Sequence, residues 1–276
     1  MKRNRKPRAE RSPWKYFKEK KNVLRVYAVL RVLVLVTLFL QLRNRNYENV
    51  FICLLTLVLF VMPSLLERKL HMKLPDALEI VILLFIFAAD ILGEINEYYV
   101  VVPHWDTALH TINGFLFAAI GFSIVNILNE DKHVSMTLSP FYMAVAAFCF
   151  SMTIGVLWEF FEWGGDCLFG LDMQKDTVMS MISSVTLHPE GRNDPVTLSG
   201  IQNVLMILED GTQVNLDVGG YLDIGLQDTM KDLLVNLIGA VVFAPIGYVY
   251  VKTKGRGRIA RMFIPEALEE DASPEA

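Results

Sequence analysis

Long apolar runs are the feature that most constrains how this chain can fold. The last of them, from Leu233 to Val251, contains no charged residue. A run of about 20 apolar residues is long enough to cross the hydrocarbon core of a membrane as a helix. Hydrophobic residues make up 53% of the 276 residues and the mean hydropathy is +0.37, both above the values of a typical soluble domain. The sequence therefore predicts an all-α polytopic membrane protein.

About six transmembrane helices are expected, in a chain with two polar tails and one long polar connection. The expected spans are approximately 23–42, 47–66, 76–98, 106–128, 138–168 and 229–251. We accordingly divide the chain into a basic tail (1–22), a five-helix membrane part (23–168), a loop (169–227), a final transmembrane helix (228–251) and a C-terminal tail (252–276).

The connection at 169–227 is expected to be a small β-rich insertion. It contains stretches of alternating polarity, and Asp210-Gly211 is a turn sequence that favours a tight hairpin over 204–218. Two roles remain open for it, a gate over a binding site and a passive surface loop, because surface loops tolerate insertions readily.

The distribution of Lys and Arg predicts that both termini are cytoplasmic and that the connection at 169–227 is extracytoplasmic. The N-terminal tail, the connection with Arg68, Lys69 and Lys73 and the segment after Val251 are basic, whereas the connection at 99–105 has no Lys or Arg. The basic tail is read as this topology signal rather than as a nucleic-acid site. Neither end resembles a cleaved export signal, and the three cysteines show no metal or disulfide spacing.

Ionisable and amide side chains recur every three or four residues at the outer ends of four expected spans, so each group lies on one helix face. They are Asp90, Glu94 and Glu97 in the third span, Asp106, His110 and Asn113 in the fourth, Glu159 and Glu162 in the fifth, and Asp228, Asp232 and Asn236 in the sixth. We expect them to meet in one site below the outer surface of the membrane.

Such groups are costly, because one charge at the middle of a span costs about 2.5–3.5 kcal/mol on insertion scales. Few cations are close by, and Lys231 is expected to point away from Asp228 and Asp232. A divalent cation, shared protons or a cationic ligand head group would each offset the negative charge.

Several of these residues also have a structural interpretation. Asp106 and Asp228 are suited to capping a helix, and an aromatic belt explains the Glu-containing stretch Trp158–Trp163 as well as function does. We nevertheless assign roles to the set. The candidate metal ligands are Asp106, His110, Glu159, Asp228 and Asp232, the candidate general base is Glu162, and the candidate ligand-binding residues are Asp90, Asn113 and Asn236.

Three motifs in order, HWDTALHTINGFL, LWEFFEW and GYLDIGLQDTMKDLLVNLIGA, resemble the YjdF-like bacterial membrane proteins, distant relatives of the VanZ-like family. The resemblance covers roughly residues 76–250 and implies a small multi-pass protein of the bacterial cytoplasmic membrane. One VanZ-like branch is associated with resistance to a glycopeptide antibiotic, which points to the cell envelope. The long loop before the last span departs from the family pattern.

Three functions fit these observations. The favoured one is a membrane factor that binds a lipid, an envelope component or a cation, with membrane lipid as the partner and no nucleic acid. A metal-dependent enzyme acting on a lipid or envelope precursor is the second, although no arginine is placed to clamp phosphate. A proton- or cation-coupled transporter is the third, although the chain has no evident inverted repeat.

Overall fold

The computed structural model describes residues 20–69, 72–130, 138–253, 255, 257 and 260–267. The chain divides into two compact units, one formed by Met1–Ile154 with Val235–Ala276 and the other by Gly155–Leu234. Residues 1–19 of the expected basic tail and residues 268–276 of the C-terminal tail lie outside the described residues.

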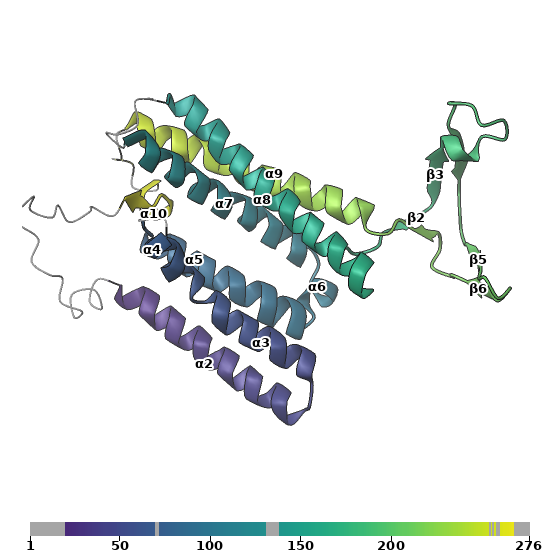
Figure 1. The fold of residues 1–276 in the computed structure, drawn as a ribbon, viewed down its shortest axis with the longest axis horizontal. Coiled ribbons are helices and arrows are strands. Elements are labelled where there is room, and N and C mark those ends of the chain that lie inside the picture. The colour runs from purple at the N-terminus through teal and green to yellow at the C-terminus, as the bar shows by residue number, and fades with distance from the viewer. Residues whose placement is uncertain are drawn as a thin grey trace, which may run out of the picture. The chain divides into compact units, whose positions relative to one another are not determined.

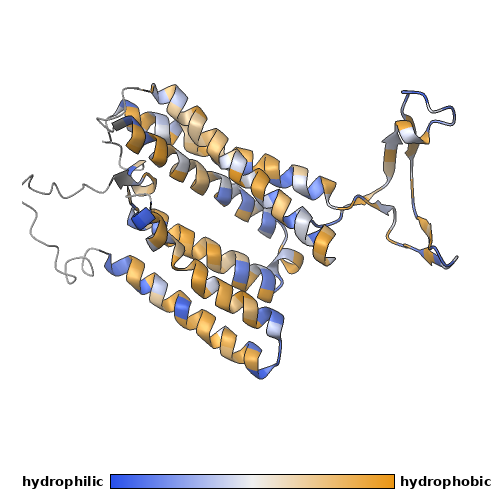
Figure 2. Cartoon of the chain, in the orientation of Figure 1, coloured by the Kyte–Doolittle hydropathy of each residue, from blue (hydrophilic) through white to orange (hydrophobic). Residues whose placement is uncertain are grey.

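Five helices in the described part of the chain are long and apolar enough to cross a membrane. They are α2 (Lys21–Arg43), the α3–α4 segment (Tyr47–Leu59 and Met62–Lys69), α7 (Trp105–Glu130), α8 (Pro140–Phe169) and α9 (Leu226–Lys252). Each corresponds to an expected span, and the multi-pass helical fold class is confirmed. Figure 2 shows hydrophobic residues along most of α2 and α3.

The third expected span, 76–98, is not one regular helix. It consists of α5 (Asp76–Phe87), a π-helix η1 (Ala88–Ile95) and the short α6 (Tyr98–Val101). The wider π-helical turn changes the face on which side chains lie. The expectation that Glu97 shares one face with Asp90 and Glu94 is therefore wrong, because it assumed one regular helix and Glu97 lies beyond the end of η1. Glu94 and Glu97 are exposed, Glu97 has a left-handed backbone (φ 57°), and Asp90 is half-buried.

Apolar packing in the first unit involves α2, α3, α5, α7 and the C-terminal part of α9. Figure 1 shows α2 and α3 as an antiparallel pair joined by a short turn. Phe243 of α9 is fully buried and packs edge to face on Phe115 and Phe122 of α7, with ring centroids 5.4 and 5.8 Å apart. Aromatic pairs in this geometry add stabilisation beyond their buried area.

Buried ion pairs join three helix ends in this unit. The ammonium of Lys20, which precedes α2, lies 2.7 Å from Glu67 of α4 and 2.6 Å from Glu79 of α5. Glu67 also accepts a hydrogen bond from the Leu74 N–H. Lys20 is only 3% exposed, so this last part of the expected basic tail belongs to the folded structure.

The C-terminal segment folds back onto the same unit. Ala260 and Ile264 are buried, in and just after the short helix α10 (Ala260–Phe263). The strand β8 (Glu266–Ala267) pairs antiparallel with β1 (Met72–Lys73). Residues 260–267 of the expected C-terminal tail are therefore part of the fold.

The second unit contains three antiparallel strand pairs. They are β2 (Val178–Met179) with β7 (Tyr221–Leu222), β3 (Met181–Ser184) with β4 (Val196–Ser199), and β5 (Leu205–Ile207) with β6 (Gln213–Asn215). The short 3-10 helix η2 (Val185–Leu187) follows β3. The last pair is the hairpin expected over 204–218, and Gly211 adopts the positive φ of 83° that its turn requires. The predicted β-rich insertion is confirmed (Figure 1).

Candidate functional site

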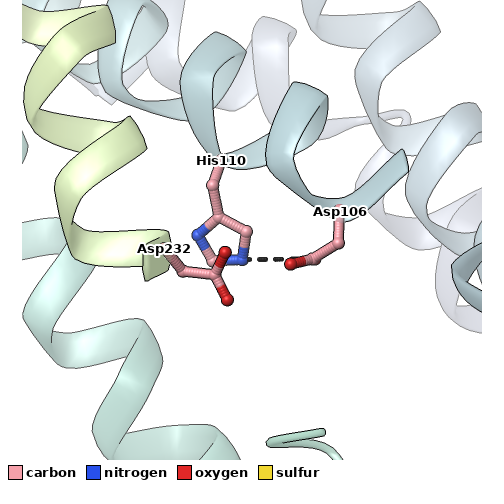
Figure 3. A group of neighbouring side chains, drawn as sticks. All are labelled: Asp106, His110 and Asp232. Carbon is pink, nitrogen blue, oxygen red and sulfur yellow. Dashed lines mark ion pairs between the residues drawn. The ribbon is translucent and has the colours of Figure 1, made fainter. Parts of the chain in front are cut away.

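Asp106 and His110 form a pair in the first turns of α7. The Nε2 atom of His110 lies 3.5 Å from Oδ1 of Asp106, and only 7% of His110 is exposed (Figure 3). Residues four apart on a helix are neighbours on one face, so this contact follows from the sequence spacing. The other carboxylate oxygen of Asp106 is buried and accepts no hydrogen bond from the described residues. The Asp106 carboxylate therefore retains ligand capacity.

A polar network below this pair joins α7, α8 and α9. Asn113 donates a hydrogen bond to the side-chain oxygen of Asn236 at 3.2 Å, and Asn236 is completely buried. The amide nitrogen of Asn236 lies 3.4 Å from the Ser151 carbonyl oxygen, and the Ser151 hydroxyl donates to the Gly114 carbonyl at 2.7 Å. Sequence reasoning missed Ser151, because a single serine in an apolar run gives only a weak signal.

Two glycines allow α7 and α9 to approach closely. A Cβ atom on Gly239 would overlap the Thr111 carbonyl oxygen, and one on Gly114 would overlap the Asn236 carbonyl oxygen. No side chain fits at either place without moving a backbone. Gly114 and Gly239 therefore permit the close packing of α7 against α9.

Asp232 lies four residues before Asn236 on α9 and is 1% exposed. It therefore shares the helix face of Asn236, as the sequence spacing predicts. The burial of a carboxylate is costly unless a partner offsets its charge.

Lys231 does not point away from the acidic face of α9 as expected. Its ammonium lies 3.6 Å from Asp228 and 4.0 Å from Asp232. The long lysine side chain bends toward carboxylates on its own helix, where residues three apart are neighbours. Asp228 also accepts a hydrogen bond from the Lys175 N–H at 2.9 Å, which ties the start of the β-rich insertion to α9.

Glu159 and Glu162 differ in their surroundings on α8. Glu159 is 4% exposed, whereas the carboxylate of Glu162 accepts a hydrogen bond from the Trp158 indole at 2.8 Å. Trp158 and Trp163 are exposed, by 46% and 59%. These exposures agree with an aromatic belt around this part of α8. The role of Glu162 as a general base stays a prediction.

Asp90 is bonded to α3. Its carboxyl oxygen Oδ2 lies 2.8 Å from the hydroxyl of Thr56, which is fully buried. Sequence reasoning did not identify Thr56, since threonine is common in apolar helices. Among the described residues, the hydrogen-bonding partner of Asp90 is therefore on α3 and not on α7.

One family model covers most of the chain. The model described as "Predicted membrane protein (DUF2238)" matches residues 25–253, which include every candidate site residue from Asp90 to Asn236. Neither the curated proteins nor the solved structures compared with the chain give a match. Since the family match extends over well more than half of the sequence, the chain belongs to the DUF2238 family of predicted membrane proteins.

Proposed function

We propose that this protein is a multi-pass protein of the bacterial cytoplasmic membrane that binds a divalent cation through Asp106, His110 and Asp232. Both termini are cytoplasmic in this proposal, and the site lies near the extracytoplasmic ends of α7 and α9. The distribution of Lys and Arg supports the orientation. The resemblance to the YjdF-like proteins supports the bacterial location.

The hydrogen bond between Asn113 and Asn236 carries the proposal. It fixes the register of α7 against α9 at one level. His110 lies three residues before Asn113, and Asp232 lies four residues before Asn236, so each is about one helical turn away from that bond. This register supports a shared level for the His110 imidazole and the Asp232 carboxylate.

The donor set suits a metal of intermediate hardness. Each of the three residues offers one ligand atom, which gives one imidazole nitrogen and two carboxylate oxygens. Imidazole ligands favour Zn²⁺, Fe²⁺ or Cu²⁺, and carboxylates also suit Mn²⁺. The buried Asp106 oxygen without a hydrogen-bonding partner among the described residues supports the same reading. We therefore expect Zn²⁺ or Mn²⁺ rather than Ca²⁺, which prefers six to eight oxygen ligands.

Such a cation would retain coordination positions for a further ligand. Three protein ligands leave an open position on a tetrahedral metal, and an anionic group can fill it. The phosphate of a membrane lipid or envelope precursor is the anionic group available at this level. The proposal requires binding and makes no claim of turnover.

Metal analysis of the purified full-length protein tests the proposal. We expect near-stoichiometric Zn²⁺ or Mn²⁺ after incubation and desalting in the wild type, and strong loss in Asp106→Asn and His110→Ala. His104→Asn is the matched control, because His104 is exposed and lies six residues from His110. Its backbone is left-handed (φ 61°), a conformation that asparagine tolerates. Equal metal content in all four proteins, or none in any, would contradict the proposal.

A further inference from the structure

The hydroxyl of Thr56 on α3 makes two short contacts. Its oxygen lies 2.8 Å from the Ile52 carbonyl oxygen and 2.8 Å from Oδ2 of Asp90. Both distances are typical of an O–H···O hydrogen bond. Thr56 is 0% exposed, so both contacts are shielded from bulk water.

A threonine hydroxyl has one proton and can donate only one hydrogen bond at a time. If Thr56 donates to the Ile52 carbonyl, the contact with Asp90 needs a proton from the carboxyl group. If Asp90 is ionised, Thr56 must donate to it, and the Ile52 oxygen then faces a lone pair at 2.8 Å. Both contacts are hydrogen bonds together only when Asp90 is protonated.

The elements packed around Asp90 supply no fixed cation. These elements are α3, α5, α6 and α7, and none of them contains Lys or Arg. The titratable groups of these elements include the buried thiol of Cys53 on α3, and η1 itself contains the carboxyl of Glu94. The remaining ones on these elements include Tyr98 and Tyr99 of α6 and the Asp106–His110 pair of α7. Among the described residues of these elements, the Asp90 carboxyl therefore has no Lys or Arg to pair with.

The local backbone is also unusual. Asp90 is the third residue of the π-helix η1. π-helical turns are rare in proteins overall, but those that occur are often at functional sites. Gly93 in the same turn faces the Tyr99 ring, where a Cβ atom would overlap the ring. The turn is therefore held by packing from α6, and it positions the Asp90 carboxyl against α3.

We propose that Asp90 is a proton-binding site, in which the acid donates to the Thr56 hydroxyl and Thr56 donates to the Ile52 carbonyl. This site is separate from the cation site of α7 and α9 and does not depend on it. Loss of the proton would turn the Thr56 hydroxyl toward Asp90 and release the Ile52 carbonyl. Proton binding is thereby linked to the contact between η1 and α3.

Infrared spectroscopy of the full-length protein in lipid nanodiscs tests this proposal. Carboxylic acids and carboxylates absorb at separate frequencies, and ¹³C-labelled aspartate distinguishes Asp from Glu. At neutral pH we expect an aspartic-acid C=O band in the wild type that is absent in Asp90→Asn. Thr56→Val should keep the band and shift it to higher frequency, since its hydrogen-bond acceptor is gone. Glu48→Gln is the control, because Glu48 is exposed on the same helix as Thr56.

The possible infrared results either support the proposal or overturn it. A labelled acid band that disappears in Asp90→Asn and shifts in Thr56→Val supports the proposal. If Asp90→Asn does not fold, the infrared spectra of the labelled wild type and of Thr56→Val are sufficient to test the proposal. A wild type without an aspartic-acid band at neutral pH, or a band unchanged in Thr56→Val, would overturn it. The Asp90 band should be the same in metal-free protein, so failure of the cation site leaves this test intact.

Discussion

Asn113 of α7 and Asn236 of α9 are joined by a side-chain hydrogen bond of 3.2 Å between two apolar helices. Asn236 is 0% exposed and reaches a third helix through the Ser151 carbonyl. In an apolar environment, a polar group without a partner costs more free energy than the bond contributes in water. This bond thus specifies one register of α7 against α9.

Replacing Asn236 by leucine should destabilise the protein. The change leaves the Asn113 amide without its acceptor, so we expect a loss of about 1–3 kcal/mol in the free energy of unfolding. Unfolding by SDS in mixed micelles, followed by circular dichroism, measures it. Asn44→Ala is the control, because Asn44 is exposed after the end of α2. A loss no larger than that of the control would show that the Asn113–Asn236 bond does not set the register.

Gly239→Ala should separate α7 from α9. The new methyl group would overlap the Thr111 carbonyl oxygen, so the helices must move apart. Overpacking of this kind costs about 1–3 kcal/mol. Gly164→Ala in α8 is the matched control, because nothing lies within 4 Å of its added Cβ. There the higher helix propensity of alanine should stabilise by about 0.5–1 kcal/mol. If both variants change the free energy of unfolding in the same direction, the close α7–α9 contact is refuted.

Lys20→Met should be strongly destabilising, because it leaves the carboxylates of Glu67 and Glu79 without their cation. Breaking a buried pair by removing one partner costs about 3–5 kcal/mol. Lys21→Met is the matched control, since Lys21 is the next residue and is exposed. Equal thermal stability of the two variants, measured in detergent, would argue against the buried ion pairs.

The ion pairs of Lys20 should contribute to stability in a way that depends on pH in one direction. Burial alone acts to lower the pKa of Lys20, but the hydrogen bonds and charges of Glu67 and Glu79 raise it in net above its ordinary value of 10.5. A raised lysine pKa gives stability that is present below the unfolded pKa and is lost as pH rises through the folded one. The difference between wild type and Lys20→Met should therefore stay constant from pH 7 to about 9. A difference that falls over this range would contradict the assignment.

The orientation proposed for the chain predicts where the β-rich insertion lies. Ser199 is exposed at the end of β4, so a cysteine there should react with a membrane-impermeant maleimide added to intact cells. The background should lack Cys53, Cys149 and Cys167. A cysteine at the exposed Lys252, at the end of α9, should react only after the membrane is made permeable. The reverse pattern would place both termini outside.

The spans could be predicted because hydrophobicity and length alone decide them, and five appear as candidate membrane-spanning helices in the described part of the chain. The helix faces of α7 and α9 could also be predicted, since the spacing of Asp106 with His110 and of Asp232 with Asn236 is α-helical. The division of the third span could not be predicted, because the prediction assumed α-helical residue spacing and a π-helix has a wider turn.

Contacts between distant segments were also beyond sequence reasoning. Lys20 lies in a run of basic residues, and nothing in that run distinguishes the one lysine that pairs with Glu67 and Glu79. Thr56 and Ser151 are single hydroxyl residues in apolar helices, where a bond to the helix's own carbonyls is the usual outcome. Only the packing of the helices shows that the Thr56 hydroxyl contacts Asp90 and that the Ser151 hydroxyl donates to the Gly114 carbonyl.

Titration of the metal-free protein with Zn²⁺ in Asp232→Asn and Asp228→Asn tests the central claim most directly. The two residues lie one turn apart on α9. Only Asp232 is assigned to the cation, whereas Asp228 accepts a hydrogen bond from the Lys175 N–H. We predict that Asp232→Asn raises the Kd for Zn²⁺ at least about tenfold, or about 1.4 kcal/mol, and that Asp228→Asn changes it much less. An unchanged Kd in Asp232→Asn would contradict the account.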